Sequence, residues 1–247
     1  MTALQRLTVK IFADGADLEE IAALARNPLI KGFTTNPTLM RKQGISDYES
    51  FGRALLKIVT DRPVSFEVFA DDPAEMAEQA YAIAAWGRNV NVKIPVTTTR
   101  GVFVGPLIGS LSAAGVMVNV TAVTMLDQVR AIAEVLAPAT PAIVSVFAGR
   151  VADTGRDPVP IMREAVNILR ARPKAELLWA SPRELLNIFH ADEVGCHIIT
   201  VTNDILKKLT LVGKDLAEYS LETVRMFHSD AQKSGYSIAQ RLRAAGE

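Results

Sequence analysis

Hydrophobic and polar positions alternate between two patterns along most of the chain. Short apolar runs, typical of buried strands, are separated by longer segments in which apolar side chains recur every three or four residues, as on one face of a helix. The predicted strands are Thr8–Ala13, Gly32–Thr35, Pro63–Val68, Val90–Ile94, Val116–Val120, Ala142–Val146, Ala175–Trp179 and Ile198–Val201. The predicted helices are Leu18–Arg26, Asp47–Ile58, Pro73–Trp86, Gly105–Ala114, Thr124–Leu136, Val159–Arg170, Pro182–Phe189 and a helix from Asp204.

Two of these helices have clear start signals, and one more helix follows the last unit. Asp17 precedes the first helix as an acidic N-cap, and Asp72 precedes a proline at the first position of another. Beyond the eighth strand, Leu216–Lys233 has apolar residues at helical spacing. These signals support the assignment of alternating strands and helices.

The order of elements predicts an α/β fold, a (β/α)8 TIM barrel with an additional C-terminal helix. Strands that alternate with helices form parallel βαβ units, and eight such units in about 200 residues are the size of a TIM barrel. The sequence has no G-x-G-x-x-G and no Walker motif, which disfavours a nucleotide-binding open sheet. We expect one domain over residues 1–247, with the barrel at about 8–210 and a helical extension at about 214–247.

Composition narrows the class of protein. The 247 residues carry 27 basic and 27 acidic side chains, and this neutral balance disfavours a nucleic-acid partner. No apolar stretch reaches the roughly 18 residues of a membrane span, so we expect no membrane association. The single cysteine, Cys196, excludes an intrachain disulfide and indicates a cytoplasmic protein. His190, His197 and His228 are dispersed and lack the spacing of a zinc site.

Polar side chains occur at or near the end of nearly every predicted strand. Active sites of TIM barrels lie at the C-terminal ends of the strands, so these residues are candidates for function. From the first to the seventh strand they are Asp14; Thr34, Thr35 and Asn36; Glu67; Lys93; Asn119 and Thr121; Ser145 and Arg150; and Ser181 and Arg183. The eighth strand contributes no residue to this set.

Lys93 is the most unusual member, because apolar residues flank it in VNVKIPV. Loss of hydration among apolar neighbours favours the neutral amine, and a neutral amine can attack a ketone to form a Schiff base. The alternative is a lysine at the strand edge whose ammonium reaches solvent or pairs with Glu67. The residues alone leave both interpretations open.

Asp14 and Glu67 are candidates for acid–base chemistry, since an iminium intermediate needs protons moved at neighbouring hydroxyls. The alternative for Asp14 is a cap on the first helix or a bond to loop amides. For Glu67, the alternative is the ion pair with Lys93 alone.

Two arginines late in the barrel are candidates for binding phosphate. Guanidinium groups suit phosphate oxygens, and TIM barrels often bind phosphate on their last loops. Arg150 and Arg183, with Ser145 and Ser181, would form such a clamp. The alternative is that both arginines lie at the surface and pair with Asp153 and Glu184.

Six segments together resemble the transaldolase family, including its fructose-6-phosphate aldolase branch. They are KIFADGAD (Lys10–Asp17), GFTTNPTLM (Gly32–Met40), VNVKIPVT (Val90–Thr97), VNVTAV (Val118–Val123), SVFAGRVAD (Ser145–Asp153) and ASPRE (Ala180–Glu184). TTNP after the second strand together with VKIPVT on the fourth is a specific pair. The resemblance spans Lys10–Leu209, most of the chain.

The resemblance implies a class I aldolase mechanism on sugar-phosphate substrates, without metal or organic cofactor. Lys93 matches the Schiff-base lysine and Asp14 the acid–base aspartate, while Glu67 and Thr121 match the pair that holds a catalytic water. Asn36 and Asn119 match the asparagines that bind the hydroxyl groups of the dihydroxyacetone unit. The complete set of substrate-binding residues that it implies is Thr34, Asn36, Asn119, Ser145, Phe147, Arg150, Ser181 and Arg183.

Within the family, two residues favour a transaldolase. This activity moves a dihydroxyacetone unit from fructose 6-phosphate or sedoheptulose 7-phosphate to erythrose 4-phosphate or glyceraldehyde 3-phosphate. Transaldolases resemble this chain in having glutamate at position 67 and phenylalanine at position 147, whereas the aldolase branch tends to glutamine and tyrosine. The alternatives are a lyase that releases free dihydroxyacetone and a transaldolase of a specialised sugar pathway.

Two further features bear on specificity and assembly. Strand alternation predicts that Trp179 points the same way as Ser181, where its indole would restrict the acceptor. Pro182 stands where long transaldolases carry an aromatic residue. The helix Leu216–Lys233 either covers the barrel mouth or packs against a neighbouring subunit, and we expect a homo-oligomer.

Overall fold

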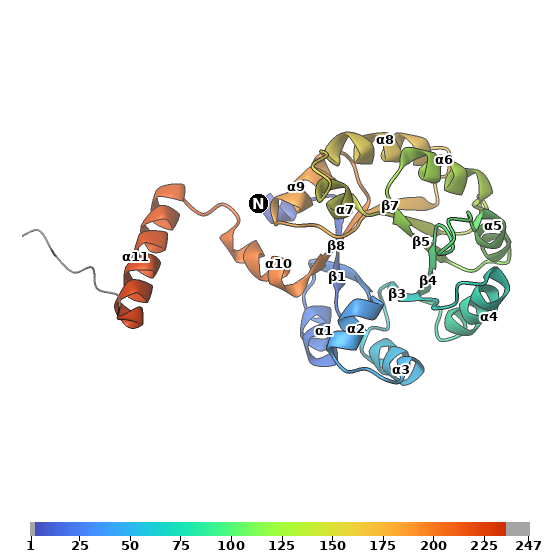
Figure 1. Ribbon diagram of the computed structural model, residues 1–247, viewed down its shortest axis with the longest axis horizontal. Coiled ribbons are helices and arrows are strands. Elements are labelled where there is room, and N and C mark those ends of the chain that lie inside the picture. Colours follow the sequence, from blue (N-terminus) through green and yellow to red (C-terminus); the bar gives the residue numbers. More distant parts are fainter. Residues whose placement is uncertain (1–2, 236–247) are drawn as a thin grey trace, which may run out of the picture. The chain divides into compact units, whose positions relative to one another are not determined.

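The computed structural model describes residues 3–235, and eight parallel strands in it form a closed barrel in sequence order, with β8 beside β1. In Figure 1 the helices that connect these strands form a ring outside them. The strands are β1 (Lys10–Asp14), β2 (Ile30–Thr34), β3 (Val64–Glu67), β4 (Val90–Pro95), β5 (Val118–Val123), β6 (Ala142–Val146), β7 (Ala175–Trp179) and β8 (Ile198–Thr202). The predicted TIM barrel is therefore confirmed.

The main helices follow the strands as predicted. They are α1 (Leu18–Ala25), α3 (Tyr48–Ile58), α4 (Pro73–Ala84), α5 (Gly105–Ala113), α6 (Leu126–Val135), α8 (Val159–Leu169), α9 (Leu186–Glu193) and α10 (Asn203–Lys207). Asp17 and Asp72 cap α1 and α4 by accepting backbone N–H bonds, as the sequence predicted. Two short 3-10 turns, η1 (Ala3–Arg6) and η2 (Lys208–Leu211), complete the described elements apart from α2, α7 and α11.

The sequence analysis missed two short helices and misplaced the start of a third. Helices α2 (Pro37–Lys42) and α7 (Ala148–Ala152) are too short to show a repeating apolar face. Helix α9 begins at Leu186, not at Pro182 as predicted. The backbone N–H groups of Arg183 and Glu184 bond to the Asn187 side chain instead of entering the helix.

Strand register brings the predicted site residues side by side. In β4, Lys93 lies between Glu67 of β3 and Asn119 of β5. Across the closure of the barrel, Asp14 of β1 pairs with Thr34 of β2 and with Thr202 of β8. Parallel strands end at the same rim, so this register gathers polar groups from distant parts of the sequence.

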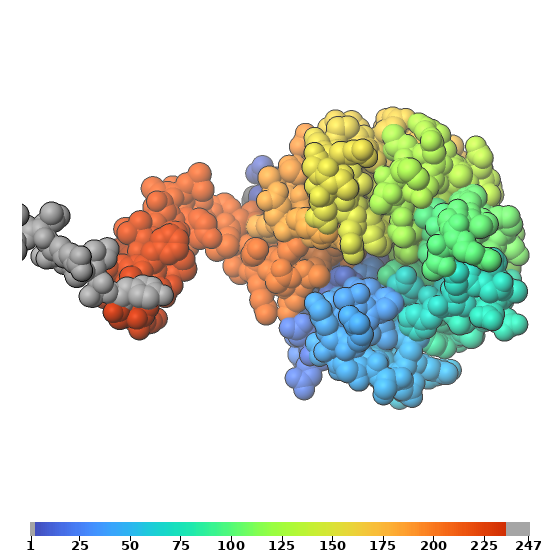
Figure 2. Space-filling model, in the orientation of Figure 1, coloured from blue at the N-terminus to red at the C-terminus, as the bar shows by residue number. Residues whose placement is uncertain are grey.

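Most apolar side chains pack in the layer between strands and helices, and a smaller cluster lies apart from them. This cluster contains Phe12, Ile143, Leu178, Ala180 and Ile198. Leu178 and Ala180 also line the main cavity, so the cluster forms part of its floor. In the space-filling view, packed helices and loops surround a hollow in the barrel (Figure 2).

The chain divides into two compact units, Met1–Leu209 and Thr210–Glu247. The second unit contains α11 (Leu216–Ser234), capped by Asp215 and by Gly235, whose φ of 65° suits glycine. The additional C-terminal helix is thus confirmed, whereas the expected extension beyond residue 235 lies outside the described residues. The expectation of a single domain stays a prediction. None of the helices in residues 3–235 combines the length and apolar character needed to cross a bilayer.

Candidate active site

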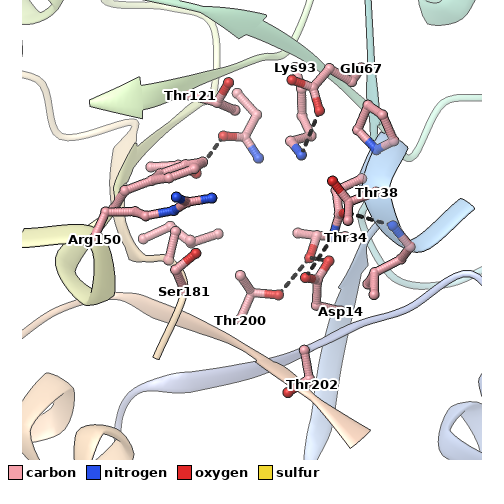
Figure 3. A pocket seen from close by; sticks show the side chains of 18 of the residues that line it. Asp14, Thr34, Thr38, Glu67, Lys93, Thr121, Arg150, Ser181, Thr200 and Thr202 are labelled. Carbon is pink, nitrogen blue, oxygen red and sulfur yellow. Dashed lines mark hydrogen bonds and ion pairs between the residues drawn. The ribbon is translucent and has the colours of Figure 1, made fainter. Parts of the chain in front are cut away.

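A cavity of about 460 Å³ lies at the C-terminal ends of the strands (Figure 3). All twelve residues to which the resemblance assigns a role line it, whereas the strand-end candidate Thr35 is fully buried and does not. The twelve are Asp14, Thr34, Asn36, Glu67, Lys93, Asn119, Thr121, Ser145, Phe147, Arg150, Ser181 and Arg183. The structure therefore brings these twelve residues together. Their catalytic and binding roles stay predictions.

Lys93 enters this cavity from β4 with its side chain only 9% exposed. Its Nζ donates to the Thr35 carbonyl oxygen at 2.8 Å and lies 3.1 Å from Glu67 Oε2. The ion pair that the sequence left open is present, and it lies within the cavity. A lysine held by two acceptors has a fixed position, with a carboxylate in place to exchange its proton.

Glu67 is anchored through its backbone to a residue that the sequence analysis did not select. Its N–H donates to Tyr48 Oη at 2.6 Å, and the Tyr48 ring packs against Phe66 and Trp86. Burial raises the pKa of Tyr48 well above its ordinary value, so the phenol stays neutral. This aromatic contact fixes the end of β3 beside Lys93.

Asp14 ends β1, and its carboxylate accepts hydrogen bonds from Thr34 Oγ1 at 2.8 Å and Asn36 Nδ2 at 3.0 Å. Burial raises the pKa of Asp14, and the charge of Lys93 and these two bonds oppose that rise. A carboxylate with a raised pKa accepts a proton more readily than one with an ordinary pKa. The alternative role as a helix cap is wrong, because Asp17 caps α1.

Strand β8 contributes two threonines that the sequence analysis missed. Thr200 and Thr202 line the cavity, and Thr200 Oγ1 lies 2.6 Å from Thr34 Oγ1. Since Thr34 donates its proton to Asp14, Thr200 is the donor in the second bond. The signal was available in IITVT, where threonines two positions apart share one face of a strand.

Asn119 is held in one orientation by two serines. Ser145 Oγ donates to Asn119 Oδ1 at 2.6 Å, and Asn119 Nδ2 donates to Ser65 Oγ at 3.1 Å. Ser65 is fully buried and was not predicted as a site residue. Thr121 lies two residues further along β5 and faces the cavity near Lys93 and Glu67 (Figure 3). This wall therefore presents a fixed amide and a hydroxyl.

A further part of the cavity consists of Arg150, Ser181 and Arg183 and is here called the arginine end. Arg150 projects into the cavity from α7 (Figure 3). Arg183 donates from Nε to Asp153 Oδ1 at 2.8 Å and from Nη2 to Oδ2 of the same carboxylate. The predicted alternative pairing with Asp153 is thus present, yet Arg183 still lines the cavity. Arg183 also holds the pKa of Asp153 below its ordinary value.

Ser181 adopts a left-handed backbone conformation, with φ of 56°. Its carbonyl oxygen packs directly on Gly149 of α7, where an added Cβ would lie only 1.5 Å from that oxygen. A non-glycine residue at positive φ stores strain and persists only where neighbours hold it. Gly149 is therefore required for this close contact between α7 and the loop after β7.

Trp179 does not face the cavity, which corrects the sequence prediction. Its side chain is 1% exposed in the main core, with its ring centroid 6.5 Å from that of His190. Leu178 and Ala180 line the cavity instead. Strand β7 ends at Trp179, and the positive φ at Ser181 breaks the alternation on which the prediction relied. The indole therefore does not restrict the pocket.

The residues described here offer no evident metal centre. Across residues 3–235, no group of three or more His, Cys, Asp or Glu side chains is placed to hold a metal ion. The chemistry available in the cavity is that of one amine, two carboxylates, several hydroxyls and amides, and two guanidinium groups.

Known proteins similar to this chain agree on one family. The family model described as Transaldolase/Fructose-6-phosphate aldolase matches residues 11–238. A "Probable transaldolase" of Dehalococcoides mccartyi is 38% identical over 202 residues, which cover 81% of this chain and 90% of that protein. Another "Probable transaldolase", from Methanococcus maripaludis, is 32% identical over 225 residues, covering 88% and 100%.

Solved structures add the fold alone. A mandelate racemase/muconate lactonizing enzyme-like protein from Rubrobacter xylanophilus superposes with a TM-score of 0.53 at 11% identity, covering 84% of this chain and 57% of that one. The sequence match is the stronger evidence, because the family model spans nearly the whole barrel. The chain belongs to the transaldolase/fructose-6-phosphate aldolase family.

Proposed function

We propose that the protein is a transaldolase that transfers a dihydroxyacetone unit between sugar phosphates through a Schiff base on Lys93. The donor is fructose 6-phosphate or sedoheptulose 7-phosphate, and the acceptor is erythrose 4-phosphate or glyceraldehyde 3-phosphate. One observation carries the proposal: a buried lysine amine, 3.1 Å from Glu67, shares a cavity with Asp14 and two arginines.

The first step forms the Schiff base. Glu67 takes a proton from the Lys93 ammonium, and the neutral amine attacks C2 of the ketose. The C2 hydroxyl of the resulting carbinolamine then leaves as water, with its proton supplied by Glu67. The short distance between Lys93 and Glu67 supports this proton transfer. Thr121 and Glu67 hold the water that leaves here and returns at hydrolysis.

The second step cleaves the C3–C4 bond. Asp14 removes the proton of the C4 hydroxyl, the bond breaks, and its electron pair moves into the iminium to give an enamine on Lys93. An aldose phosphate departs as the aldehyde. The hydrogen bonds from Thr34 and Asn36 hold the Asp14 carboxylate in one orientation for this transfer.

The third step forms a new bond and releases the product. The enamine carbon attacks the acceptor aldehyde, and Asp14 returns its proton to the new alkoxide. Water then hydrolyses the iminium and frees Lys93. Asn36 and Asn119 contact hydroxyls of the three-carbon unit, and Ser145 fixes the Asn119 amide. The arginine end binds the phosphate, and the proposal requires no metal or organic cofactor.

A lyase is the second candidate function, and Phe147 is the observation that separates the two. In a lyase, water protonates the enamine and free dihydroxyacetone leaves. Phe147 lines the cavity and carries no hydroxyl to assist that water. This supports retention of the enamine for transfer. A transaldolase of a specialised sugar pathway would use the same residues with another acceptor.

The decisive experiment measures glyceraldehyde 3-phosphate release from fructose 6-phosphate, with and without erythrose 4-phosphate. Release that depends on the acceptor, with sedoheptulose 7-phosphate formed, would establish the transaldolase. Sustained release without acceptor would establish the lyase instead. Borohydride should fix substrate onto the wild type and onto Lys10→Met but not onto Lys93→Met, because Lys10 pairs with Glu176 outside the cavity.

Two further features bear on where the protein is located in the cell and on its oligomeric state. The single cysteine, Cys196, is buried as a free thiol, which supports a cytoplasmic setting. Helix α11 exposes large apolar side chains, and apolar surface of this kind often marks a protein interface. We therefore include a homo-oligomer in the proposal.

A further inference from the structure

The two arginines at the arginine end differ in how they are held. The Arg150 guanidinium makes no hydrogen bond or ion pair with any residue that the structure describes. Arg183 instead makes two bonds to Asp153 and a third, at 3.1 Å, from Nη1 to the Ser181 carbonyl oxygen. One cation is therefore fixed before any ligand arrives, and the other is free to adjust.

The geometry leaves Arg183 able to bind an anion. A guanidinium has five N–H groups, of which these three bonds use three, so two remain for a ligand. The paired bonds to one carboxylate also fix the plane of the guanidinium. Asp153 itself follows α7 directly and is tied to it by a bond from its N–H to the Gly149 carbonyl at 3.0 Å.

The backbone that carries Arg183 is held as well. Its N–H donates to Asn187 Oδ1 at 2.8 Å, and the Glu184 N–H donates to the same oxygen at 3.2 Å. Ser181 packs on Gly149. With the loop held in this way, the long Arg183 side chain is the part that still needs restraint, and Asp153 supplies it.

We propose that Asp153 is a positioning residue for phosphate recognition: it holds Arg183 in a binding orientation and so favours phosphorylated over unphosphorylated sugars. Asp153 acts mainly through Arg183, to which it is hydrogen-bonded, while the Arg150 charge also helps to lower the pKa of Asp153. The inference rests on the proposed function, because it takes Arg183 as a phosphate-binding residue.

Asp153 also has a second effect, which would weaken phosphate binding instead of strengthening it. The two effects predict opposite results when Asp153 is removed. A carboxylate repels phosphate, so its removal would strengthen binding if repulsion dominated. The Asp153 side chain is 48% exposed, and solvent and salt weaken such repulsion. Restraining a free arginine, by contrast, costs conformational entropy each time a ligand binds. We expect the orienting effect to outweigh the repulsion.

The test compares wild type with Asp153→Ala and Asp153→Asn. Calorimetry measures the Kd for inorganic phosphate, and steady-state kinetics measures kcat and KM for fructose 6-phosphate and for unphosphorylated fructose. For the alanine variant we expect Kd and KM for the phosphorylated ligands to rise roughly three- to tenfold through the lost restraint. The asparagine variant keeps one acceptor and should lie between. KM for fructose and kcat should stay within about twofold, since Asp153 does not contact the reacting atoms.

A control is Asp127→Ala, which removes an aspartate–arginine ion pair with Arg130 on α6, where Asp127 is 92% exposed, and should change none of these values. Unchanged or tighter phosphate binding by Asp153→Ala would overturn the inference, as would an equal rise in KM for fructose. The proposed function fails separately, through a wild type that binds phosphate but turns over no sugar. In that case the Kd comparison still decides the role of Asp153. A wild type that neither binds phosphate nor turns over sugar overturns both.

Discussion

At the scale of single residues, hydrogen bonds from neighbouring side chains and backbone hold several functional groups of the cavity in one orientation. Asp14 is the clearest case, because Thr34 and Asn36 both donate to it and Thr200 donates to Thr34. A buried carboxylate without such donors would hold its proton too strongly to act as a base. The donors therefore tune Asp14 as well as orient it.

Removal of one donor should move the pH dependence of the reaction. In Thr34→Val the Asp14 carboxylate loses a bond that lowers its pKa, so the pKa rises further above its ordinary value. The base must be ionised, and the acid limb of kcat/KM should therefore shift to higher pH. Thr202→Val is the control, because Thr202 lines the same cavity and bonds to Asp204. A limb that stays in place or shifts to lower pH would contradict this account of Asp14.

Phe147 governs the fate of the enamine in our proposal. Phe147→Tyr adds a hydroxyl in the cavity, where it can orient the water that protonates the enamine. We expect free dihydroxyacetone to form from fructose 6-phosphate several times faster without an acceptor, while transfer to erythrose 4-phosphate falls. Phe147→Leu removes the ring without adding a hydroxyl and should not raise this release. If the tyrosine variant released no more than wild type, the proposed role of Phe147 would be wrong.

At the scale of elements, the sequence allowed prediction of every strand because period and capping are local properties. Asp17 before α1 and Asp72 before α4 act through bonds within a single turn. The errors occurred where tertiary contacts override local pattern. Ser181 packs on Gly149 and has a positive φ instead of strand geometry. Strand alternation therefore does not extend from Trp179 to Ser181, and the prediction that Trp179 faces the cavity was wrong. The contact between Ser65 and Asn119 could not be predicted either, because only the folded barrel brings the two residues together.

The contact between α7 and the loop after β7 should be sensitive to one methyl group. In Gly149→Ala the new Cβ would lie 1.5 Å from the Ser181 carbonyl oxygen, so the backbone must move. We expect a loss of about 2 kcal/mol in the free energy of unfolding, as for other overpacked sites, together with weaker binding of inorganic phosphate. Urea unfolding and calorimetry measure the two effects. Gly15→Ala, with no atom within 4 Å of its Cβ, should behave as wild type.

At the scale of the whole molecule, the barrel collects into one cavity residues that are far apart in the chain. Asp14 and Arg183 come from opposite ends of the barrel sequence, and closure of β8 against β1 completes the ring between them. The order of βα units predicted this arrangement. Assembly was different, because an apolar helix face predicts burial without naming its partner. The exposed residues of α11 therefore require an experiment.

Self-association through α11 predicts that one added charge on its apolar face lowers the oligomeric mass. Leu216, Tyr219, Val224 and Phe227 recur at helical spacing, and Phe227 is 64% exposed in the single chain. Phe227→Glu would place a carboxylate in the interface, where desolvation is costly. Sedimentation velocity should then detect dissociation toward the 26.7 kDa monomer. Ser229→Glu adds the same charge on the other side of the helix and should leave the mass unchanged. A wild type that sediments as a monomer at micromolar concentration would remove the homo-oligomer from the proposal.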